Sequence, residues 1–362
     1  MSYGVNVNLE IESELRKHGH FNYDIELGSM AELVDAPDSK SGHFGGVGSI
    51  PSTPTKNMDI INSKYLGKIK DNFLDLINEE LINNDPHLKK SLNLWGENLH
   101  KKNVDLPDGF KLKFGNDEGL ENHIEKVIRE FNLETNSENF LEIGCGSGVD
   151  LRYIIKNFNF KKFFAVDIGK NVYDLSQINN FKKFFFCRCD CNNLPFKDNS
   201  FDLIYSYGVF HHTKNFKRSI LEAKRVLSPK GTMLFYNYKK HKNLLKRFGT
   251  LIESILLMLF KNLNFNQTKF ICFLISPLIL LLFSYPAQIF KLCGSKKMYK
   301  SFPLWWGKTP LNIIGDLMDR LCSPINKRFT KKEMIEYLKK INFSKIEVLD
   351  VRDGLFCKVS KE

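Results

Sequence analysis

Short apolar runs recur along the chain from residue 139 onward, with helical patterns between them. The runs lack the polar residue at every second position that marks a half-exposed strand. Continuous runs of this kind are typical of parallel strands covered on both faces. We therefore predict strands at 140–143, 163–166, 184–187, 201–206 and 232–236.

Helices are predicted between these strands. Residues 151–158 carry apolar side chains at spacings of three and four, and residues 216–227 repeat that pattern. A capping box at 330–333 begins a last helix, and the segments 346–351 and 355–359 are expected to pair as a hairpin. Strand–helix–strand units wind in a right-handed sense. The predicted fold class is α/β, a doubly wound Rossmann-like sheet of mostly parallel strands with an antiparallel last strand, N-terminal helices and a helical insertion after the fifth strand.

The apolar content of 43% excludes a chain that is disordered as a whole. The patterns divide the chain into five expected segments. They are a disordered or mis-annotated extension at 1–57, a helical and lid-like segment at 58–138, a cofactor-binding core at 139–238, an apolar and basic insertion at 239–327, and the last helix with the closing strands at 328–362.

The extension at 1–57 carries a pattern that does not look like protein coding. Residues 31–42, AELVDAPDSKSG, resemble a leucine transfer-RNA gene translated in frame. We hypothesise that translation begins at Met58, and an ordinary disordered tail is the alternative; the absence of a transfer-RNA fold in the coding DNA would end the hypothesis. No basic start followed by an apolar run is present, so we expect no secretory signal and a cytoplasmic protein.

A glycine-rich turn follows the first predicted strand and precedes a helix, at the point where open α/β sheets bind ligands. Its spacing is G-x-G-x-G over Gly144, Gly146 and Gly148, whereas dinucleotide sites use G-x-G-x-x-G to place a pyrophosphate on a helix N-terminus. Glu142 would repel a phosphate and attract an ammonium or sulfonium group. We interpret Cys145 as a small residue that fits the turn.

Further polar residues follow the next strands. Asp167 ends the second strand, where a carboxylate can accept both ribose hydroxyls, and Asp190 ends the third, where it can accept from an adenine amino group. The motifs Leu194-Pro195-Phe196 and Arg225-Val226-Leu227-Ser228-Pro229-Lys230-Gly231 come later in the same order. Together these elements resemble the class I S-adenosylmethionine-dependent methyltransferases, specifically the type 11 family, over about residues 120–238 and more loosely over 328–360.

The resemblance implies the cofactor S-adenosyl-L-methionine, which carries a methyl group on a positive sulfur. If the acceptor must lose a proton, His211 and His212 are the first candidates for the base, and the alternative is that they only bind backbone groups. Tyr236 and Tyr238 are expected to line the acceptor side. The cofactor-binding residues implied are Glu142, Gly144, Cys145, Gly146, Gly148, Asp167, Ile168, Asp190, Cys191, Ser206 and Tyr207.

The formal charge of +12 is concentrated late in the chain, where residues 239–332 hold 17 basic and 3 acidic residues. Residues 270–290 contain no charge, which is long enough for a membrane span. The sheet must resume on the same side of any membrane, and Pro277 and Pro286 are expected to interrupt a straight helix. Two interpretations remain: cap helices over the acceptor pocket, or a hairpin in the inner leaflet. The basic residues expected to hold that hairpin are Lys239, Lys240, Lys242, Lys246, Arg247, Lys296, Lys297 and Lys300.

The eight cysteines do not form a disulfide scaffold in a chain of this length. Cys187, Cys189 and Cys191 alternate with other residues along one predicted strand and its end. We interpret them as buried reduced thiols and not as a metal site, so no metal is predicted.

The leading hypothesis is a methyltransferase acting on an apolar or amphiphilic small molecule such as a lipid, a quinone precursor or a lipid-linked glycan. It would meet an anionic membrane surface from the cytoplasmic side, whereas nucleic acid is disfavoured because the basic segment is rich in aliphatic residues. The first alternative is a methyltransferase of a soluble metabolite with the insertion as cap. An NAD-dependent oxidoreductase is opposed by the glycine spacing and Glu142. The other alternative is a non-catalytic membrane-associated binding protein.

Overall fold

The computed structural model describes residues 59–94, 123–133, 136–146, 148–178, 181–304, 307, 309–323, 325–351 and 354–361. The chain divides into two compact units, and the smaller one, residues 1–55 with 117–121, lies outside the described residues. The predictions for 1–57 and for the lid-like segment between Trp95 and Phe110 therefore also fall outside them. All of the described residues belong to the larger unit, 56–116 with 122–362.

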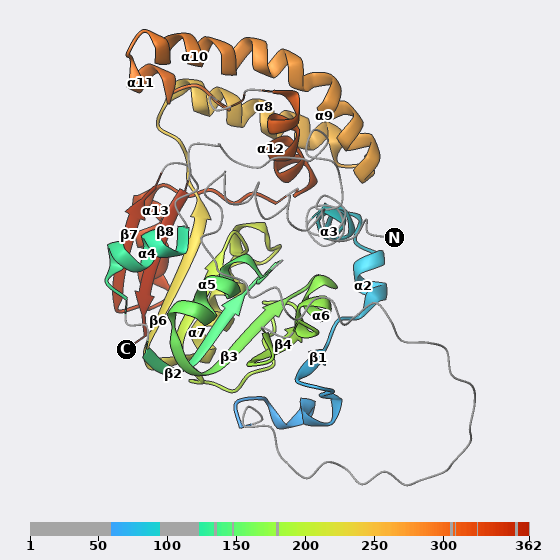
Figure 1. Ribbon diagram of the computed structural model, residues 1–362, viewed down its shortest axis with the longest axis vertical. Coiled ribbons are helices and arrows are strands. Elements are labelled where there is room, and N and C mark those ends of the chain that lie inside the picture. The colour runs from blue at the N-terminus through green and yellow to red at the C-terminus, as the bar shows by residue number, and fades with distance from the viewer. Residues whose placement is uncertain are drawn as a thin grey trace, which may run out of the picture. The chain divides into compact units, whose positions relative to one another are not determined.

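Eight strands form one sheet in the order β1-β4-β3-β2-β5-β6-β8-β7 (Figure 1). Neighbours from β1 to β6 run parallel, whereas β8 is antiparallel to both β6 and β7. The predicted Rossmann-like fold class, with its antiparallel last strand, is thereby confirmed. The strands are β1 Phe73–Asp75, β2 Asn136–Ile143, β3 Asn159–Asp167, β4 Phe184–Arg188, β5 Phe201–Tyr207, β6 Leu227–Tyr238, β7 Lys345–Asp350 and β8 Gly354–Ser360.

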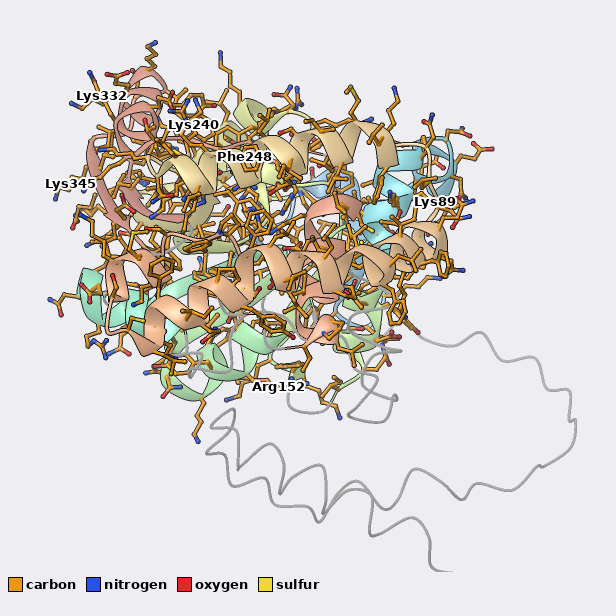
Figure 2. All side chains as sticks on the ribbon, turned by 90° about the horizontal axis from the view of Figure 1, so that it is seen from above. Lys89, Arg152, Lys240, Phe248, Lys332 and Lys345 are labelled. Carbon is orange, nitrogen blue, oxygen red and sulfur yellow. The ribbon has the colours of Figure 1, made fainter. Side chains whose placement is uncertain are left out.

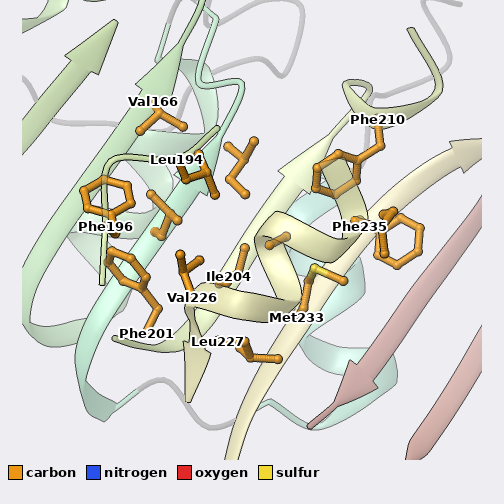
Figure 3. Packing of buried hydrophobic residues seen from close by; sticks show 14 of the residues in the cluster. Val166, Leu194, Phe196, Phe201, Ile204, Phe210, Val226, Leu227, Met233 and Phe235 are labelled. Carbon is orange, nitrogen blue, oxygen red and sulfur yellow. The ribbon is translucent and has the colours of Figure 1, made fainter. Parts of the chain in front are cut away.

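Both faces of the sheet are covered, which explains why the strands are apolar without interruption. Successive side chains point to opposite faces, so Leu141 and Phe164 lie in one core cluster and Phe140 and Phe163 in the other. The first cluster, part of which is drawn in Figure 3, includes residues of α7 (Phe216–Val226) and α13 (Lys331–Lys340). The second includes residues of α4 (His123–Phe131), α5 (Val149–Asn157) and α6 (Asn171–Ser176).

The helical segment expected at 58–138 does not begin with a long helix, so this part of the prediction is wrong. A short 3-10 helix, η3 (Ser63–Lys68), is followed by a turn in which Asp71 and Asn72 have positive φ angles of 47° and 62°, and then by β1. Ile61 packs in the first core cluster and bridges to Phe196, and Leu74 of the edge strand β1 packs in the same cluster. Helices α2 (Glu79–Asn83) and α3 (Pro86–Leu92) begin only after that strand.

The insertion between β6 and α13 is helical, as expected. It comprises α8 (Leu244–Phe260), α9 (Phe265–Ile279), the π-helical turn η8 (Leu280–Ser284), α10 (Tyr285–Leu292), α11 (Lys296–Tyr299) and α12 (Pro310–Cys322). These helices lie at the carboxyl end of β6 (Figure 1). A core cluster of their own joins α8, α9, η8 and α12, and also includes Leu94.

The two prolines do not divide the helix, because Phe265–Leu292 is continuous, but a π-helical turn at Leu280–Ser284 interrupts its α-helical pattern between them. Pro277 removes the N–H that would bind the Phe273 carbonyl. The Ser276 hydroxyl donates to that same carbonyl at 3.0 Å and supplies the missing bond. The π-helical turn between Leu280 and Ser284 and the position of Pro286 in the first turn of α10 accommodate the second proline.

The aromatic centre of the first core cluster gives a stability prediction. The Phe164 ring is fully buried and lies 5.2–5.7 Å from the rings of Phe185, Phe196 and Phe201. Phe164→Ala should lower the free energy of unfolding by about 3–5 kcal/mol, because it removes apolar contacts and leaves a cavity. Denaturant titration measures the loss. Leu221→Ala on the exposed side of α7 is the control, and an equal loss in both variants would contradict this description of the core.

Candidate functional site

The glycine loop joins the end of β2 to α5 and requires backbone conformations that only glycine adopts readily. Gly144, Gly146 and Gly148 have φ angles of 80°, 52° and 73°. The N–H groups of Gly144 and Cys145 donate to the Val166 carbonyl at 2.7 and 3.2 Å. A Cβ atom at Gly144 would lie 2.0 Å from a methyl carbon of Val209, so the loop after β5 is in close contact with the glycine loop.

The carboxylate of Asp167, at the end of β3, is fixed by backbone groups on both of its oxygens. Oδ2 accepts from the Gly146 N–H at 2.9 Å and Oδ1 from the Gly169 N–H at 2.7 Å. The Asn171 side chain donates to the Gly146 carbonyl from α6. Each carboxylate oxygen retains a second lone pair, so Asp167 can still accept hydroxyl donors at the entrance of the loop.

Glu142, the next-to-last residue of β2, is a carboxyl group buried at 2% exposure. Its Oε2 atom has no hydrogen-bond partner among the described residues. Burial raises the pKa of Glu142 well above its ordinary value, and the nearby carboxylates of Asp150 and Asp167 raise it further. A buried carboxylate is costly unless a cation or hydrogen-bond donors accompany it. The site therefore fits a positively charged group such as the methionine end of the cofactor.

Cys145 and Gly148 complete the glycine loop. The Gly148 N–H donates to the Cys145 carbonyl at 2.8 Å, and Gly148 then caps the start of α5 in a left-handed conformation. Burial raises the pKa of the Cys145 thiol well above its ordinary value, so it remains protonated. This agrees with the interpretation of Cys145 as a small residue that fits the turn.

On the predicted adenine side, Asp190 also organises the turn that follows β4. Its Oδ1 accepts from both the backbone N–H and the side-chain amide of Asn192, at 2.8 Å each. Asn192 in turn accepts from the Ser219 hydroxyl at 3.0 Å. Burial raises the pKa of the half-buried Cys191 thiol, so this neighbour is neutral. The roles of Asp190 and Cys191 toward adenine remain predictions.

Arg188 is a positioning residue that the sequence pattern did not single out. Its guanidinium is buried at the end of β4, where Nε donates to the Ile168 carbonyl at 3.2 Å. Nη1 pairs with Glu79 at 2.6 Å and with Asp75 at 3.4 Å. It therefore ties the N-terminal segment to the loop after β3. The sequence signal that could have identified this role is a single arginine directly after the apolar run 184–187.

The two signature motifs contact each other. Arg225 of α7 donates to the carbonyls of Leu194 and Phe196 at 3.0 and 2.8 Å and pairs with Glu222 at 2.9 Å. Glu222 also accepts from the Leu194 N–H at 3.0 Å. These bonds fix the loop that follows Asp190, so the motif residues act on the proposed site by positioning this loop.

Past β5, Ser206 and Tyr207 lie at the strand end where they were expected, with different neighbours. The Ser206 hydroxyl is buried and donates to the Ile143 carbonyl at 2.9 Å, which links β5 to the end of β2. The Tyr207 ring stacks on Tyr236 of β6 at 4.6 Å and lies 5.8 Å from the ring of Phe356. An aromatic cluster, of which Tyr236 and Phe356 are buried, thus lies between the end of β5 and β6.

The histidine pair lies on a single 3-10 turn (Phe210–His212), with ring centroids 4.1 Å apart. His212 Nδ1 lies 2.9 Å from the Ile325 carbonyl, so this nitrogen carries the proton and Nε2 does not. Burial lowers the pKa of His212 to about 4. Burial also lowers the pKa of His211 well below its ordinary value, and His212 adds to that effect. Both imidazoles are therefore neutral near pH 7.

A buried polar network, also not anticipated, links this pair to the insertion. The Tyr238 ring lies 4.1 Å from that of His211, and its hydroxyl donates to Asp319 of α12 at 3.1 Å. Burial raises the pKa of Asp319 to about 6. A backbone hydrogen bond also joins the histidine turn to the segment after α12, since the Lys327 N–H donates to the His211 carbonyl at 3.0 Å.

All eight cysteines are free thiols, and Cys187 and Cys189 are buried. Among the described residues no group of three or more His, Cys, Asp and Glu side chains could hold a metal ion.

Comparison with known proteins places the site in a family. Residues 141–235 match the family model described as a methyltransferase domain. The sequence is 31% identical over 121 residues to a phthiotriol/phenolphthiotriol dimycocerosates methyltransferase of Mycobacterium ulcerans, covering 33% of this chain and 45% of that protein. It is also 31% identical over 105 residues to the sterol 24-C-methyltransferase erg6 of Schizosaccharomyces pombe, covering 27% of each.

The chain thus spans less than half the length of these curated relatives. Among solved structures, a SAM-dependent methyltransferase from Aquifex aeolicus aligns with 71% of this chain and 95% of its own, at 16% identity and a TM-score of 0.38. The strand order, the glycine loop and the match over residues 141–235 agree with one another. Residues 141–235 of this chain therefore form a methyltransferase domain, with the fold of the class I S-adenosylmethionine-dependent methyltransferases.

Proposed function

We propose that the protein transfers the methyl group of S-adenosylmethionine to an apolar or amphiphilic small molecule. The buried Glu142 carboxyl beside the glycine loop carries the methyl-transfer part of the proposal, because it is suited to a cationic ligand and unsuited to a pyrophosphate. When bound, the cofactor supplies the methyl group on a positively charged sulfur, which needs no metal or reductant.

Residues at the ends of β2, β3 and β4 would each bind a different part of that cofactor. Glu142 and the glycine backbone would hold the methionine end, Asp167 the ribose and Asp190 the adenine. Asp167 is already oriented by the Gly146 and Gly169 N–H groups, which reduces the ordering required on binding. Contact between Val209 and Gly144 helps to exclude water from the reacting end of the site.

The acceptor would lie toward β6 and the insertion, where the surroundings favour an apolar molecule. The half-buried Tyr207 ring packs there against the buried rings of Tyr236 and Phe356. A cavity of about 110 Å³ lies among the insertion helices, and its lining combines apolar side chains such as Leu256 and Phe283 with the charged Glu253 and Arg320. The two curated relatives named above are methyltransferases of a dimycocerosate compound and of a sterol, which supports an apolar acceptor over a soluble metabolite.

If the acceptor atom carries a proton, a neutral imidazole is available to receive it. His212 presents an unprotonated Nε2 because its Nδ1–H is held by the Ile325 carbonyl. His211, against Tyr238, is the second candidate. Positioning of the acceptor in line with the methyl group would supply the larger share of the rate.

Removing the Asp167 carboxylate should weaken cofactor binding. Asp167→Ala in the full chain should raise the Kd for S-adenosylhomocysteine about ten- to a hundredfold, because hydrogen bonds to a charged group contribute about 1.5–3 kcal/mol. Titration calorimetry measures the change. Glu336→Gln, an exposed carboxylate on α13, is the matched control and should leave the Kd unaltered. Equal Kd values for Asp167→Ala and the unmodified chain would contradict the proposed site.

Replacing Glu142 should affect stability and binding in opposite directions. Its raised pKa means that the folded free protein retains a proton that the unfolded chain releases. The contribution of Glu142 to stability is thus present below its unfolded pKa and is lost as pH rises toward the raised folded value. Glu142→Gln should increase the free energy of unfolding near pH 8 by about 1 kcal/mol or more.

The same substitution should weaken binding of the cofactor's ammonium group. In the unmodified chain, affinity for S-adenosylhomocysteine should rise with pH because binding releases the Glu142 proton, and this pH dependence should be absent in Glu142→Gln. Calorimetry in two buffers of different ionisation enthalpy detects the released proton. A Glu142→Gln chain that is less stable and binds normally would indicate a purely structural carboxyl group.

A further inference from the structure

The insertion exposes large apolar side chains along two neighbouring helices. On α8 the exposed positions recur at helical spacing, and the same holds for the continuous helix Phe265–Leu292. We name these exposed side chains the outer face. Its members are Leu244, Leu245, Phe248, Leu251, Ile255, Met258, Leu259, Phe270, Phe273, Leu274, Leu278, Leu281, Leu282, Tyr285, Ile289 and Leu292. Phe248 is labelled in Figure 2, which looks down on the insertion.

The buried side of the continuous helix has the opposite character. Thr268, Cys272, Ser276, Ser284 and Ala287 are all fully buried there. A helix in water directs its large apolar residues inward and its polar residues outward. Phe265 and Leu280 are buried beside these small residues, whereas most leucine and phenylalanine side chains of the helix face outward. Small residues in the protein contact and large apolar residues outside it are found where the surroundings of a helix are themselves apolar.

The charged side chains around the outer face are almost all basic. Residues 239–304 contain eleven Lys or Arg residues and one acidic residue, Glu253. The Glu253 carboxylate is directed inward, where it pairs with Arg320 at 3.0 Å and with Arg328 at 2.6 Å. The exposed surface of 239–304 therefore offers no carboxylate. Its cations lie near the ends of the two helices, as with Arg247 and Lys291.

A basic groove adjoins this surface, with a volume of about 1080 Å³. The segment after β6, α11 and α13 form it, and its members include Lys242, Lys297, Lys300, Lys331 and Lys339. Lys240 and Lys239 also line it but are paired with Glu333 and Asp350. Lysine-rich surface beside an apolar face is the combination by which peripheral proteins bind anionic lipid.

We propose that the outer face docks into the surface of an anionic lipid bilayer, with the basic groove over the lipid headgroups. The helices would lie in the plane of the bilayer, since β6 and α13 on either side of the insertion belong to one core and a single crossing would separate them. A helix of 28 residues extends about 42 Å along such a surface.

A second copy of the chain fits this face less well. Burying two outer faces against each other would also bring together two basic grooves, in which lysines outnumber the carboxylates Glu336 and Asp350. An anionic bilayer can bury the apolar outer face and also pair its headgroup charges with the lysines. If the proposed function holds, docking would also admit a bilayer-dissolved acceptor on the insertion side of the site, although the docking surface itself does not depend on methyl transfer.

Flotation of the full chain with vesicles tests the inference. Vesicles of phosphatidylcholine with phosphatidylglycerol should carry the protein upward, and phosphatidylcholine alone should bind it more weakly because it lacks net negative charge. Phe273→Gln with Leu281→Gln should lower the partition coefficient by about tenfold per side chain. Ile178→Gln with Leu221→Gln replaces two exposed apolar side chains outside the insertion and should bind as the unmodified chain does.

A separate variant tests the contribution of the basic groove. Lys297→Glu with Lys300→Glu should reduce binding to the anionic vesicles and leave binding to phosphatidylcholine unchanged. High salt should do the same. Because these positions are exposed, S-adenosylhomocysteine binding should persist in every variant and reports that the chain is folded.

Absence of the unmodified chain from floated anionic vesicles would overturn the inference, and retained cofactor binding would show that the proposed function stands without it. Equal flotation of the Phe273/Leu281 and Ile178/Leu221 variants would also overturn it. So would a dimer without lipid, seen in sedimentation velocity, that the Phe273→Gln and Leu281→Gln changes dissociate, since the outer face would then be covered by a second copy.

Discussion

A buried carboxyl group at the end of β2 is the constraint on which the site depends. Glu142 lies in the middle of a largely apolar sheet, and burial together with Asp150 and Asp167 raises its pKa. A fold maintains such a group at a cost in stability. The cost is offset when a cation enters, so the free protein is less stable than it could be and is ready for a positively charged ligand. Three glycines and the two backbone donors to Asp167 then set the shape of that site.

The insertion is joined to the same site by polar contacts as well as by the chain. Tyr238 at the end of β6 lies against His211 and donates to Asp319 of α12, while the Glu253 carboxylate binds two arginines nearby. A buried polar network of this kind fixes the orientation of its members. The helices that carry the outer face are thereby positioned against the proposed acceptor side of the core. The proposed acceptor side and the proposed docking surface therefore belong to one structural unit.

Much of the core could be predicted from sequence, because uninterrupted apolar runs, a glycine loop and the two short motifs are local signals. The strand β1 could not, since its three residues gain their conformation from the edge of β4 and the turn at Asp71 and Asn72. The continuity of the helix through Pro277 depends on a hydroxyl bond from Ser276, which no propensity anticipates.

Within the site, the sequence indicated the residues at strand ends and missed those that position them. Arg188, Asn171 and Asp319 reach the site from neighbouring strands and helices, and their contacts exist only in the folded chain. The uncharged apolar run at 270–290 was visible in the sequence. Which side of α9 is buried is decided by α12, whose residues pack against Cys272 and Leu280.

A crystal structure of the full chain with S-adenosylhomocysteine tests the central claim most directly. The account predicts the ammonium group of the ligand within hydrogen-bond distance of the Glu142 carboxylate and both ribose hydroxyls on Asp167. A ligand bound elsewhere, or one bound at the glycine loop with Glu142 still lacking a partner, would contradict it.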